Sequence, residues 1–220
     1  MKNSMPALMR LVLFTCITTS SIKVAADDST TPKEPHKNLV VYFSQPEDVS
    51  LDGVDAVSGA SLLRKNQQNL GATQYIAKLI EQKVGADIYP IEPAQPYPRD
   101  HKPLVDFAQQ EKRNRVRPAI KHPLPDLEQY DTVFIGYPIW WYQMPMILYT
   151  FLEENDFSGK KVIPFSTHGG SRLSGTVREI IALQPNAHVE TDAFSISRDD
   201  VADSSTPEEV YEWLDDIEVK

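Results

Sequence analysis

The sequence predicts an α/β domain in which a five-stranded parallel sheet lies between two layers of helices, a doubly wound three-layer fold. Short apolar runs rich in β-branched residues alternate along the chain with longer amphipathic stretches. The apolar runs are continuous rather than alternating, which is typical of strands that are covered on both faces. A length of 220 residues suits one domain of this kind, and strands that alternate with helices wind into a parallel sheet.

The amino terminus is predicted to lie outside this domain as a secretory signal over residues 1–26. Lys2 and Arg10 come before or beside the apolar run LVLFTCI, and the small-residue sequence VAA precedes Asp27. The apolar run is much shorter than the roughly 20 residues that a membrane-spanning helix needs. We therefore expect signal cleavage, a secreted or periplasmic protein and no membrane span.

Cys16 is the only cysteine, and it lies inside the predicted signal. Anchoring as a lipoprotein through Cys16 is the less favoured alternative, because Phe14 and Thr15 match the small residues of a lipobox poorly. Without Cys16 the chain has no disulfide, thiol nucleophile or thiolate metal site. The formal net charge of −9 argues against nucleic acid and anionic lipid as partners.

The elements of the domain follow in order after a polar, proline-bearing leader over residues 27–37, so that the domain covers 38–220. The predicted strands are NLVVYF, ADIYPIE, DTVFIGYP, KKVIPFSTHGG and HVETDAFSI. The predicted helices are GATQYIAKLIEQKV, LVDFAQQEKRN, MILYTFLEEN, LSGTVREIIALQP and PEEVYEWLDDI. The clearest apolar stripes at helical spacing are Tyr75, Ile76, Leu79 and Ile80, and Val210, Trp213, Leu214 and Ile217.

The loop after the first strand carries the residues expected of a phosphate site. In an open parallel sheet, ligands bind beyond the carboxyl ends of the strands, where the winding direction reverses. Ser44 ends the first strand, and the first helix opens at Gly71 or Ala72. Two hydroxyls, those of Ser44 and Thr73, can surround a phosphate together with free backbone N–H groups. The alternative remains that Thr73 is an ordinary first-turn residue and Ser44 an ordinary strand end.

The loops after the third and fourth strands are aromatic and glycine-rich. Neighbouring residues of a strand point to opposite faces, so Trp140 and Trp141 cannot both enter one core from a regular strand. They either lie in a loop or serve a ligand. Gly169 and Gly170 allow the backbone to approach a ligand closely. Three such loops at one sheet edge suit a planar, aromatic and phosphorylated ligand.

The strings YFS, GYPIWW, FLEENDFSGKKVIPFSTHGGS and ISRDDV resemble the flavodoxin-like family, and within it the bacterial flavodoxin-type oxidoreductases. The resemblance runs from about Asn38 to Val201. It implies the flavodoxin-like strand order 2-1-3-4-5 and one flavin mononucleotide (FMN), bound non-covalently. The residues it implies are Ser44, Gln45, Gly71, Ala72 and Thr73 at the ribityl phosphate, Pro138, Ile139, Trp140 and Trp141 along the isoalloxazine, and Thr167, His168, Gly169, Gly170 and Ser171 at the ring's polar atoms. The alternative for one tryptophan is packing against a helix only.

Two features depart from the family's usual phosphate loop. About 25 residues separate Ser44 from Gly71, so an insertion over 45–70 has to bulge outward, and Ala72 stands where asparagine is common. The insertion contains VDAVSGAS, which is similar to the attachment motif of proteins with FMN esterified to a Ser or Thr. That motif would make Ser61 the acceptor. We favour a polar loop, since the rest of such a domain is absent.

The sequence lacks the motifs of metal sites, serine hydrolases and dinucleotide-binding folds. The five histidines show no metal-ligand spacing, and G-x-S-x-G and G-x-G-x-x-G are absent, so we expect no metal, serine hydrolase or dinucleotide fold. No catalytic residue is identified. The basic residues Lys112, Arg113, Arg115 and Arg117 are interpreted as decoration of a helix end.

The function expected from the resemblance is electron transfer or reduction of a small molecule of the quinone type by an FMN-binding protein. The alternative is an inactive ligand-binding module on the same scaffold. The electron donor and acceptor cannot be identified from the sequence.

Overall fold

The computed structural model describes residues 37–46, 62–65 and 68–219. The chain divides into two compact units, residues 1–34 and 35–220, and only the second contains described residues. The predicted signal, most of the leader, most of the insertion and Ser61 lie outside the described residues. Within the described part, no helix is long and apolar enough to cross a membrane.

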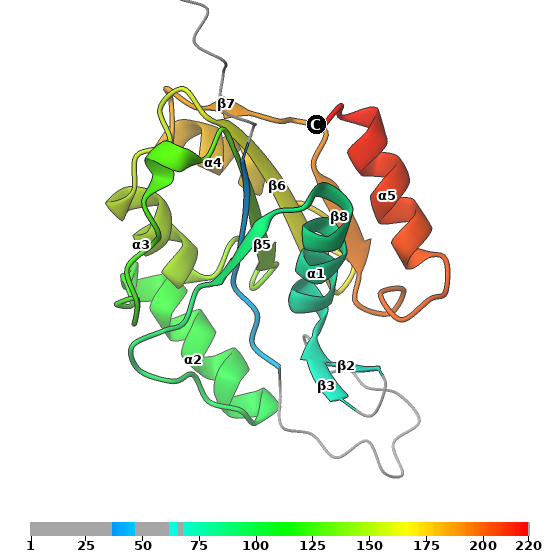
Figure 1. Cartoon of the computed structure of the whole chain (residues 1–220). Helices are drawn as coiled ribbons and strands as arrows, with labels where there is room; N and C mark the ends of the chain where they lie inside the picture. Colours follow the sequence, from blue (N-terminus) through cyan, green and yellow to red (C-terminus); the bar gives the residue numbers. More distant parts are fainter. Residues whose placement is uncertain (1–36, 47–61, 66–67, 220) are drawn as a thin grey trace, which may run out of the picture. The chain divides into compact units, whose positions relative to one another are not determined.

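One parallel sheet forms the centre of the domain (Figure 1). Its strands are β1 (Asn38–Tyr42), β4 (Asp87–Pro90), β5 (Thr132–Pro138), β6 (Lys161–His168), β7 (His188–Val189) and β8 (Phe194–Ser197). They are ordered β4-β1-β5-β6-β7, and β8 also pairs with β6. This order confirms the predicted 2-1-3-4-5 arrangement of a flavodoxin-like fold, with the fifth predicted strand divided into β7 and β8.

The division of the fifth strand has a local cause. β7 pairs with the start of β6 at Lys161 and Val162, whereas β8 pairs with its end. Between β7 and β8, the Glu190 carboxylate accepts hydrogen bonds from the backbone N–H groups of Thr191 and Asp192, at 2.8 and 3.1 Å. A side chain that binds nearby backbone donors in this way competes with the strand ladder. The continuous fifth strand of the sequence prediction is therefore wrong over these residues.

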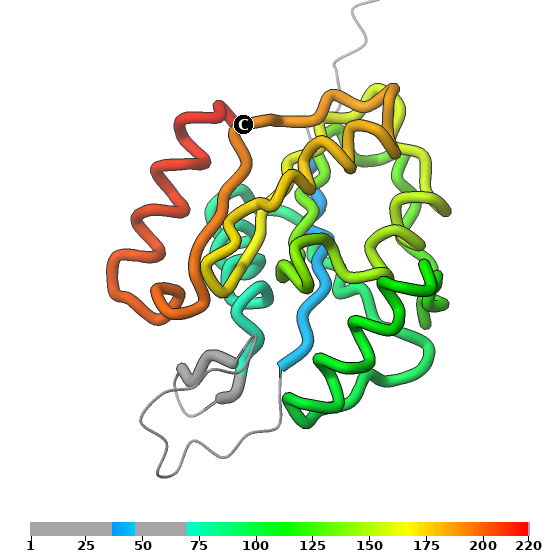
Figure 2. Tube along the Cα trace, turned by 180° about the vertical axis from the view of Figure 1, so that it is seen from behind, coloured from blue at the N-terminus to red at the C-terminus, as the bar shows by residue number. Residues whose placement is uncertain are grey.

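Helices cover both faces of the sheet, as the views from the two sides show (Figures 1 and 2). α1 (Ala72–Val84) and α5 (Thr206–Asp216) lie on one face. α2 (His101–Asn114), α3 (Met146–Glu154) and α4 (Thr176–Leu183) lie on the other, together with the short 3-10 helix η1 (Leu127–Gln129). All five predicted helices are confirmed, and α1 begins at Ala72 as expected.

The core consists of two apolar layers that share the sheet. In β1, Val40 and Tyr42 pack toward α1 and α5, while Leu39 and Val41 pack toward the other helices. Because successive side chains of a strand alternate between faces, a strand that is buried throughout serves both layers. This explains the continuous apolar runs of the sequence.

The described part of the insertion is an antiparallel hairpin of β2 (Leu62–Lys65) and β3 (Gln68–Gly71). β3 runs directly into α1, and Figure 1 shows the hairpin beyond the amino-terminal end of that helix. Gly71 returns the chain to Ser44: a Cβ added to Gly71 would lie only 1.8 Å from Ser44 Oγ. The two ends of the insertion therefore meet beside the start of α1.

Candidate functional site

The three loops singled out by the sequence leave the same edge of the sheet. Tyr42 of β1 is in register with Gly136 of β5, and Pro138 of β5 with Thr167 of β6. Beyond the strands, the Ile139 N–H donates to the Thr167 carbonyl oxygen at 2.8 Å. The predicted phosphate, aromatic and glycine-rich segments therefore start side by side.

The amino terminus of α1 is suited to an anion. Gly71 is the N-cap residue, so no side-chain cap is possible there, and the first turn contains no acidic residue. Free N–H groups and the helix dipole attract negative charge at such a position. Next to it, Ser44 Oγ is buried without a hydrogen-bond partner in the described part of the chain. A buried hydroxyl without a hydrogen-bond partner lowers the stability of the folded protein, unless a ligand or a water molecule supplies the missing hydrogen bond.

Thr73 connects this end of the site to β6. Its Oγ1 lies 2.8 Å from Thr167 Oγ1, and both residues are buried. A hydroxyl carries one proton and can also accept, so when Thr167 donates, the proton of Thr73 remains for another acceptor. The two predicted site residues are thus brought together, and Thr73 also ties the first turn of α1 to the sheet.

The aromatic loop is a tight turn with unusual backbone angles. Trp140 and Gln143 exchange both backbone hydrogen bonds, at 3.0 and 3.1 Å. The two residues between them, Trp141 and Tyr142, have φ angles of 52° and 63°. Large side chains rarely occupy this left-handed region, and such strain is found preferentially at functional sites.

The three aromatic residues of this loop have different environments. Trp140 is 8% exposed and packs edge-on against Phe43 and Tyr97, with ring centroids 5.4 and 5.6 Å away. Trp141 is 38% exposed and Tyr142 is 74% exposed. Trp140 is therefore part of the core, while Trp141 and Tyr142 present aromatic surface at the rim.

Helix α2 holds Trp141 at two points. The indole Nε1–H donates to the Val105 carbonyl oxygen at 3.1 Å, and Lys112 Nζ donates to the Trp141 carbonyl oxygen. Lys112 belongs to the basic cluster that the sequence analysis assigned to helix-end decoration. For Lys112 that interpretation is incomplete, because the side chain holds the strained turn.

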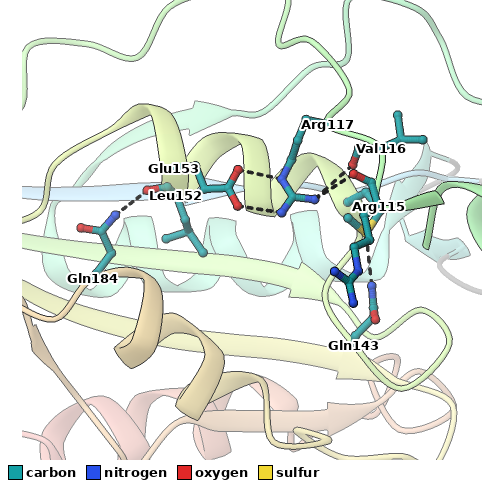
Figure 3. Close-up of polar contacts among 8 residues, drawn as sticks. Arg115, Val116, Arg117, Gln143, Leu152, Glu153 and Gln184 are labelled. Atoms are coloured by element: carbon teal, nitrogen blue, oxygen red, sulfur yellow. Dashed lines mark hydrogen bonds and ion pairs between the residues drawn. The ribbon is translucent and has the colours of Figure 1, made fainter. Parts of the chain in front are cut away.

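Arg117 from the same cluster has a different structural partner (Figure 3). Its guanidinium binds both carboxylate oxygens of Glu153 on α3 at 2.7 Å, and it also donates to the carbonyl oxygens of Arg115 and Val116. Figure 3 also shows Gln143, whose Nε2 lies 3.2 Å from Met146 Sδ. The contacts of Arg117 tie residues 115–117 to α3, the helix that follows the aromatic turn, so Arg117 is a structural residue.

The glycine-rich loop after β6 is shaped by His168. The Gly170 N–H donates to His168 Nδ1 at 2.9 Å, so the neutral ring carries its proton on Nε2. Burial lowers the pKa of His168 below its usual value, the positive charge of Arg172 lowers it further, and Asp200 acts in the opposite direction. His168 is therefore a neutral donor near pH 7.

Further along, this loop is held from the sheet. The buried Tyr137 hydroxyl lies 2.9 Å from Thr176 Oγ1, which donates to the Leu173 carbonyl oxygen at 2.6 Å. The Ser174 hydroxyl donates to the Ser171 carbonyl oxygen at 3.0 Å. The loop contains left-handed residues, so these contacts stabilise a conformation that the chain would otherwise disfavour.

A cavity of about 170 Å³ lies against the aromatic loop. It is lined by Ile139, Trp140, Trp141 and Arg198, and by His101, Leu104, Val105 and Ala108 of α2. A larger cavity of about 510 Å³ lies between the loops after β1 and β4 and includes Ser44 and Gln45. The sequence analysis did not identify Arg198 or the α2 residues, although ISRDDV was one of the strings that carried the family resemblance.

The described residues contain no group of three or more His, Cys, Asp or Glu side chains that could hold a metal ion. The groups that the structure brings together at this edge of the sheet are hydroxyls, backbone N–H groups, aromatic rings and the Arg198 side chain.

A family model described as flavodoxin matches residues 62–217, which include α1 and the loops after β5 and β6. The chain belongs to the flavodoxin family. This confirms the resemblance that was based on the sequence strings.

Similar solved structures agree with this assignment. A Bacteroides eggerthii protein, provisionally named a flavoprotein, is 31% identical, with 84% of this flavodoxin-family chain and 99% of that chain covered and a TM-score of 0.62. A Bacteroides uniformis protein with the same provisional name is 29% identical, with coverages of 83% and 99% and a TM-score of 0.62. A Lactobacillus acidophilus flavoprotein, solved in complex with FMN, is 19% identical, with coverages of 81% and 98% and a TM-score of 0.52. No curated protein matches the chain.

Proposed function

We propose that this flavodoxin-family protein binds one FMN non-covalently and transfers electrons, either as a shuttle or by reducing a small molecule of the quinone type. The observation that carries the proposal is the meeting, at one sheet edge, of a helix terminus whose N-cap is glycine, a buried hydroxyl without a partner among the described residues, and a strained aromatic turn. The similar L. acidophilus flavoprotein, which was solved with FMN, supports the choice of ligand.

The amino terminus of α1 fits the phosphate of FMN. Ser44 Oγ needs a partner, and the phosphate oxygens are strong acceptors for it. The N–H groups of Ala72 and Thr73, together with the helix dipole, would add to the binding. Gln45 borders the same region and is proposed as a further donor. This donor set needs no lysine or arginine at the phosphate.

The loops after β5 and β6 fit the isoalloxazine. Ile139 and the half-exposed Trp141 offer apolar and aromatic surface, and stacking of this kind contributes about 0.5–1.5 kcal/mol beyond the area buried. Gly170 permits close approach of the backbone, because a Cβ added there would meet no described atom within 4 Å, whereas Gly169 faces Arg198. Thr167 and Ser171 are the neighbouring polar residues. The Gly170 N–H donates to Nδ1 of the neutral His168, so the Nε2–H of His168 would be its donor to the ring.

FMN, when bound, supplies the redox chemistry, and the protein supplies position, exclusion of water and electrostatics. In this proposal Ser44 and α1 fix one end, and the Trp141 turn fixes the ring. Lys112 and Val105 hold that turn through hydrogen bonds within the protein itself. Binding to a site formed in advance avoids much of the cost of ordering a loop.

Titration of the purified protein, freed of bound flavin, with FMN tests the proposal. We expect saturable quenching of flavin fluorescence at one equivalent, a visible spectrum typical of bound flavin, and reversible bleaching by dithionite. Acid precipitation should release all flavin and leave a polypeptide of unmodified mass. Absence of saturable quenching would refute FMN binding. A polypeptide heavier by the mass of one FMN would refute non-covalent binding and would make Ser61 the candidate attachment site.

A further inference from the structure

Arg198 lies at the boundary between the two loops of the proposed ring site. It follows β8, and its backbone N–H donates to the His168 carbonyl oxygen at 2.8 Å. The backbone of Arg198 is therefore fixed to the end of β6, next to the glycine-rich loop. Its side chain lines the 170 Å³ cavity together with Ile139, Trp140 and Trp141.

The guanidinium group lies directly over Gly169. A Cβ built on Gly169 would be 3.1 Å from Arg198 Cζ and 3.2 Å from Nη1. Glycine at this position allows the cation to pack against the loop backbone, close to where the ring is proposed to bind. Arg198 is the arginine of the string ISRDDV, and it lies at the proposed ring site rather than at the phosphate site.

The positive charge of Arg198 is only weakly neutralised. Its Nε is buried and has no hydrogen-bond partner among the described residues. Within the part of the chain that the structure describes, the carboxylate in ion-pair range of Arg198 belongs to Asp199, whose Oδ1 is 3.7 Å from Nε and whose side chain is 72% exposed. Exposed ion pairs of this kind are weak, because water screens them. The Arg198 side chain itself is 27% exposed, so its charge acts through a medium less polarisable than water.

We propose that Arg198 is the charge that sets the redox potential of this site, by stabilising the reduced form of the bound flavin. The inference rests on the proposed FMN binding. Two-electron reduction adds two electrons and one proton to the neutral ring, which leaves one net negative charge. Arg198 attracts that charge and has no comparable attraction for the oxidised ring. It therefore strengthens binding of reduced FMN and raises the midpoint potential.

Replacement of Arg198 by methionine tests the inference with two measurements. The dissociation constant of oxidised FMN comes from fluorescence quenching, and the midpoint potential at pH 7 from titration with dithionite, which supplies the electrons. Arg198→Met should change the affinity for oxidised FMN by less than about threefold. It should weaken reduced FMN by about tenfold, equivalent to a potential lower by about 30 mV for a two-electron couple.

Three further variants separate charge from shape. Arg198→Lys keeps the charge and should retain most of the potential. Asp199→Asn removes the nearby carboxylate and should raise the potential slightly. Arg113→Met makes the same chemical change at an exposed position near the end of α2 and should leave the potential unchanged.

The inference is overturned if Arg198→Met shifts the potential no more than Arg113→Met. It is equally overturned if Arg198→Met weakens oxidised and reduced FMN by the same factor, since Arg198 would then only shape the cavity. Failure of the wild-type protein to bind FMN refutes the proposed function itself, and this is visible before any variant is compared. Thermal melting of each variant checks that the fold is intact.

Discussion

Replacement of Ser44 by alanine should separate stability from binding. Ser44 Oγ is buried without a partner in the described part of the chain. An unsatisfied buried polar group costs about 1–3 kcal/mol. Its removal should therefore leave the protein without FMN as stable as before, or more stable by up to about 1 kcal/mol once lost packing is included.

Binding should change in the opposite direction. A hydrogen bond to a charged group contributes about 1.5–3 kcal/mol, so Ser44→Ala should weaken FMN by roughly 10- to 150-fold. Urea unfolding with and without saturating FMN gives both quantities, and calorimetric titration confirms the affinity. Gly71→Ala is the steric counterpart, because its new Cβ would have to move Ser44 Oγ from 1.8 Å away. It should weaken FMN and also cost about 1–3 kcal/mol of stability through overpacking.

The reasoning about Ser44 is refuted if Ser44→Ala loses more than about 1 kcal/mol of stability without FMN, while its affinity for FMN remains within about twofold of wild type. That result would mean that Ser44 has a structural partner and does not contact the phosphate.

Three other predictions concern the aromatic turn, a buried carboxyl group and the amino terminus. Trp140→Ala should cost about 3–5 kcal/mol of stability because Trp140 packs in the core, whereas Trp141→Ala should mainly lower the affinity for FMN because Trp141 is partly exposed. Urea unfolding and quenching titrations of the two variants distinguish these effects, and the reverse pattern would contradict them. Burial raises the pKa of Glu111, and a hydrogen bond from Tyr97 opposes this only in part. The folded state thus holds the Glu111 proton more tightly, so its contribution to stability is complete below the unfolded pKa and is lost as pH rises through the folded one. In urea unfolding, Glu111→Gln should therefore gain stability relative to wild type as pH rises above about 4.5, the ordinary pKa of a glutamate side chain, and a difference independent of pH would refute this. We also propose export: cell fractionation and mass spectrometry should find the protein outside the cytoplasm with Asp27 as its first residue, and an intact Met1 would refute cleavage.

The fold could be predicted because its signals are local and agree with one another. The continuous apolar runs of β1, β5 and β6 indicated strands covered on both faces, and the stripe containing Tyr75 and Ile80 indicated α1. The break between β7 and β8 could not be predicted in this way. It depends on how the Glu190 side chain turns back onto its own backbone, which hydrophobic periodicity does not register.

The sequence predicted which loops form the candidate site, but not how the side chains within those loops are arranged. Turns with two left-handed residues usually contain glycine or asparagine, and neither occurs at Trp141 and Tyr142, so no residue pattern indicated a turn there. The burial of Trp140 depends on Phe43 and Tyr97, which are distant in sequence. Arg198 reaches the site only because β8 pairs with the end of β6. These contacts are consequences of tertiary structure.

The hydrogen bond between Thr73 and Thr167 joins segments 94 residues apart in the chain. A contact of such long range carries a high loop-closure cost, because the intervening chain loses conformational freedom when the contact forms. Both halves of the ligand edge therefore exist together only after β6 has docked, and a ligand has no complete binding surface on a partly folded chain. A ligand that binds only the folded protein should accordingly slow unfolding and have little influence on the folding rate.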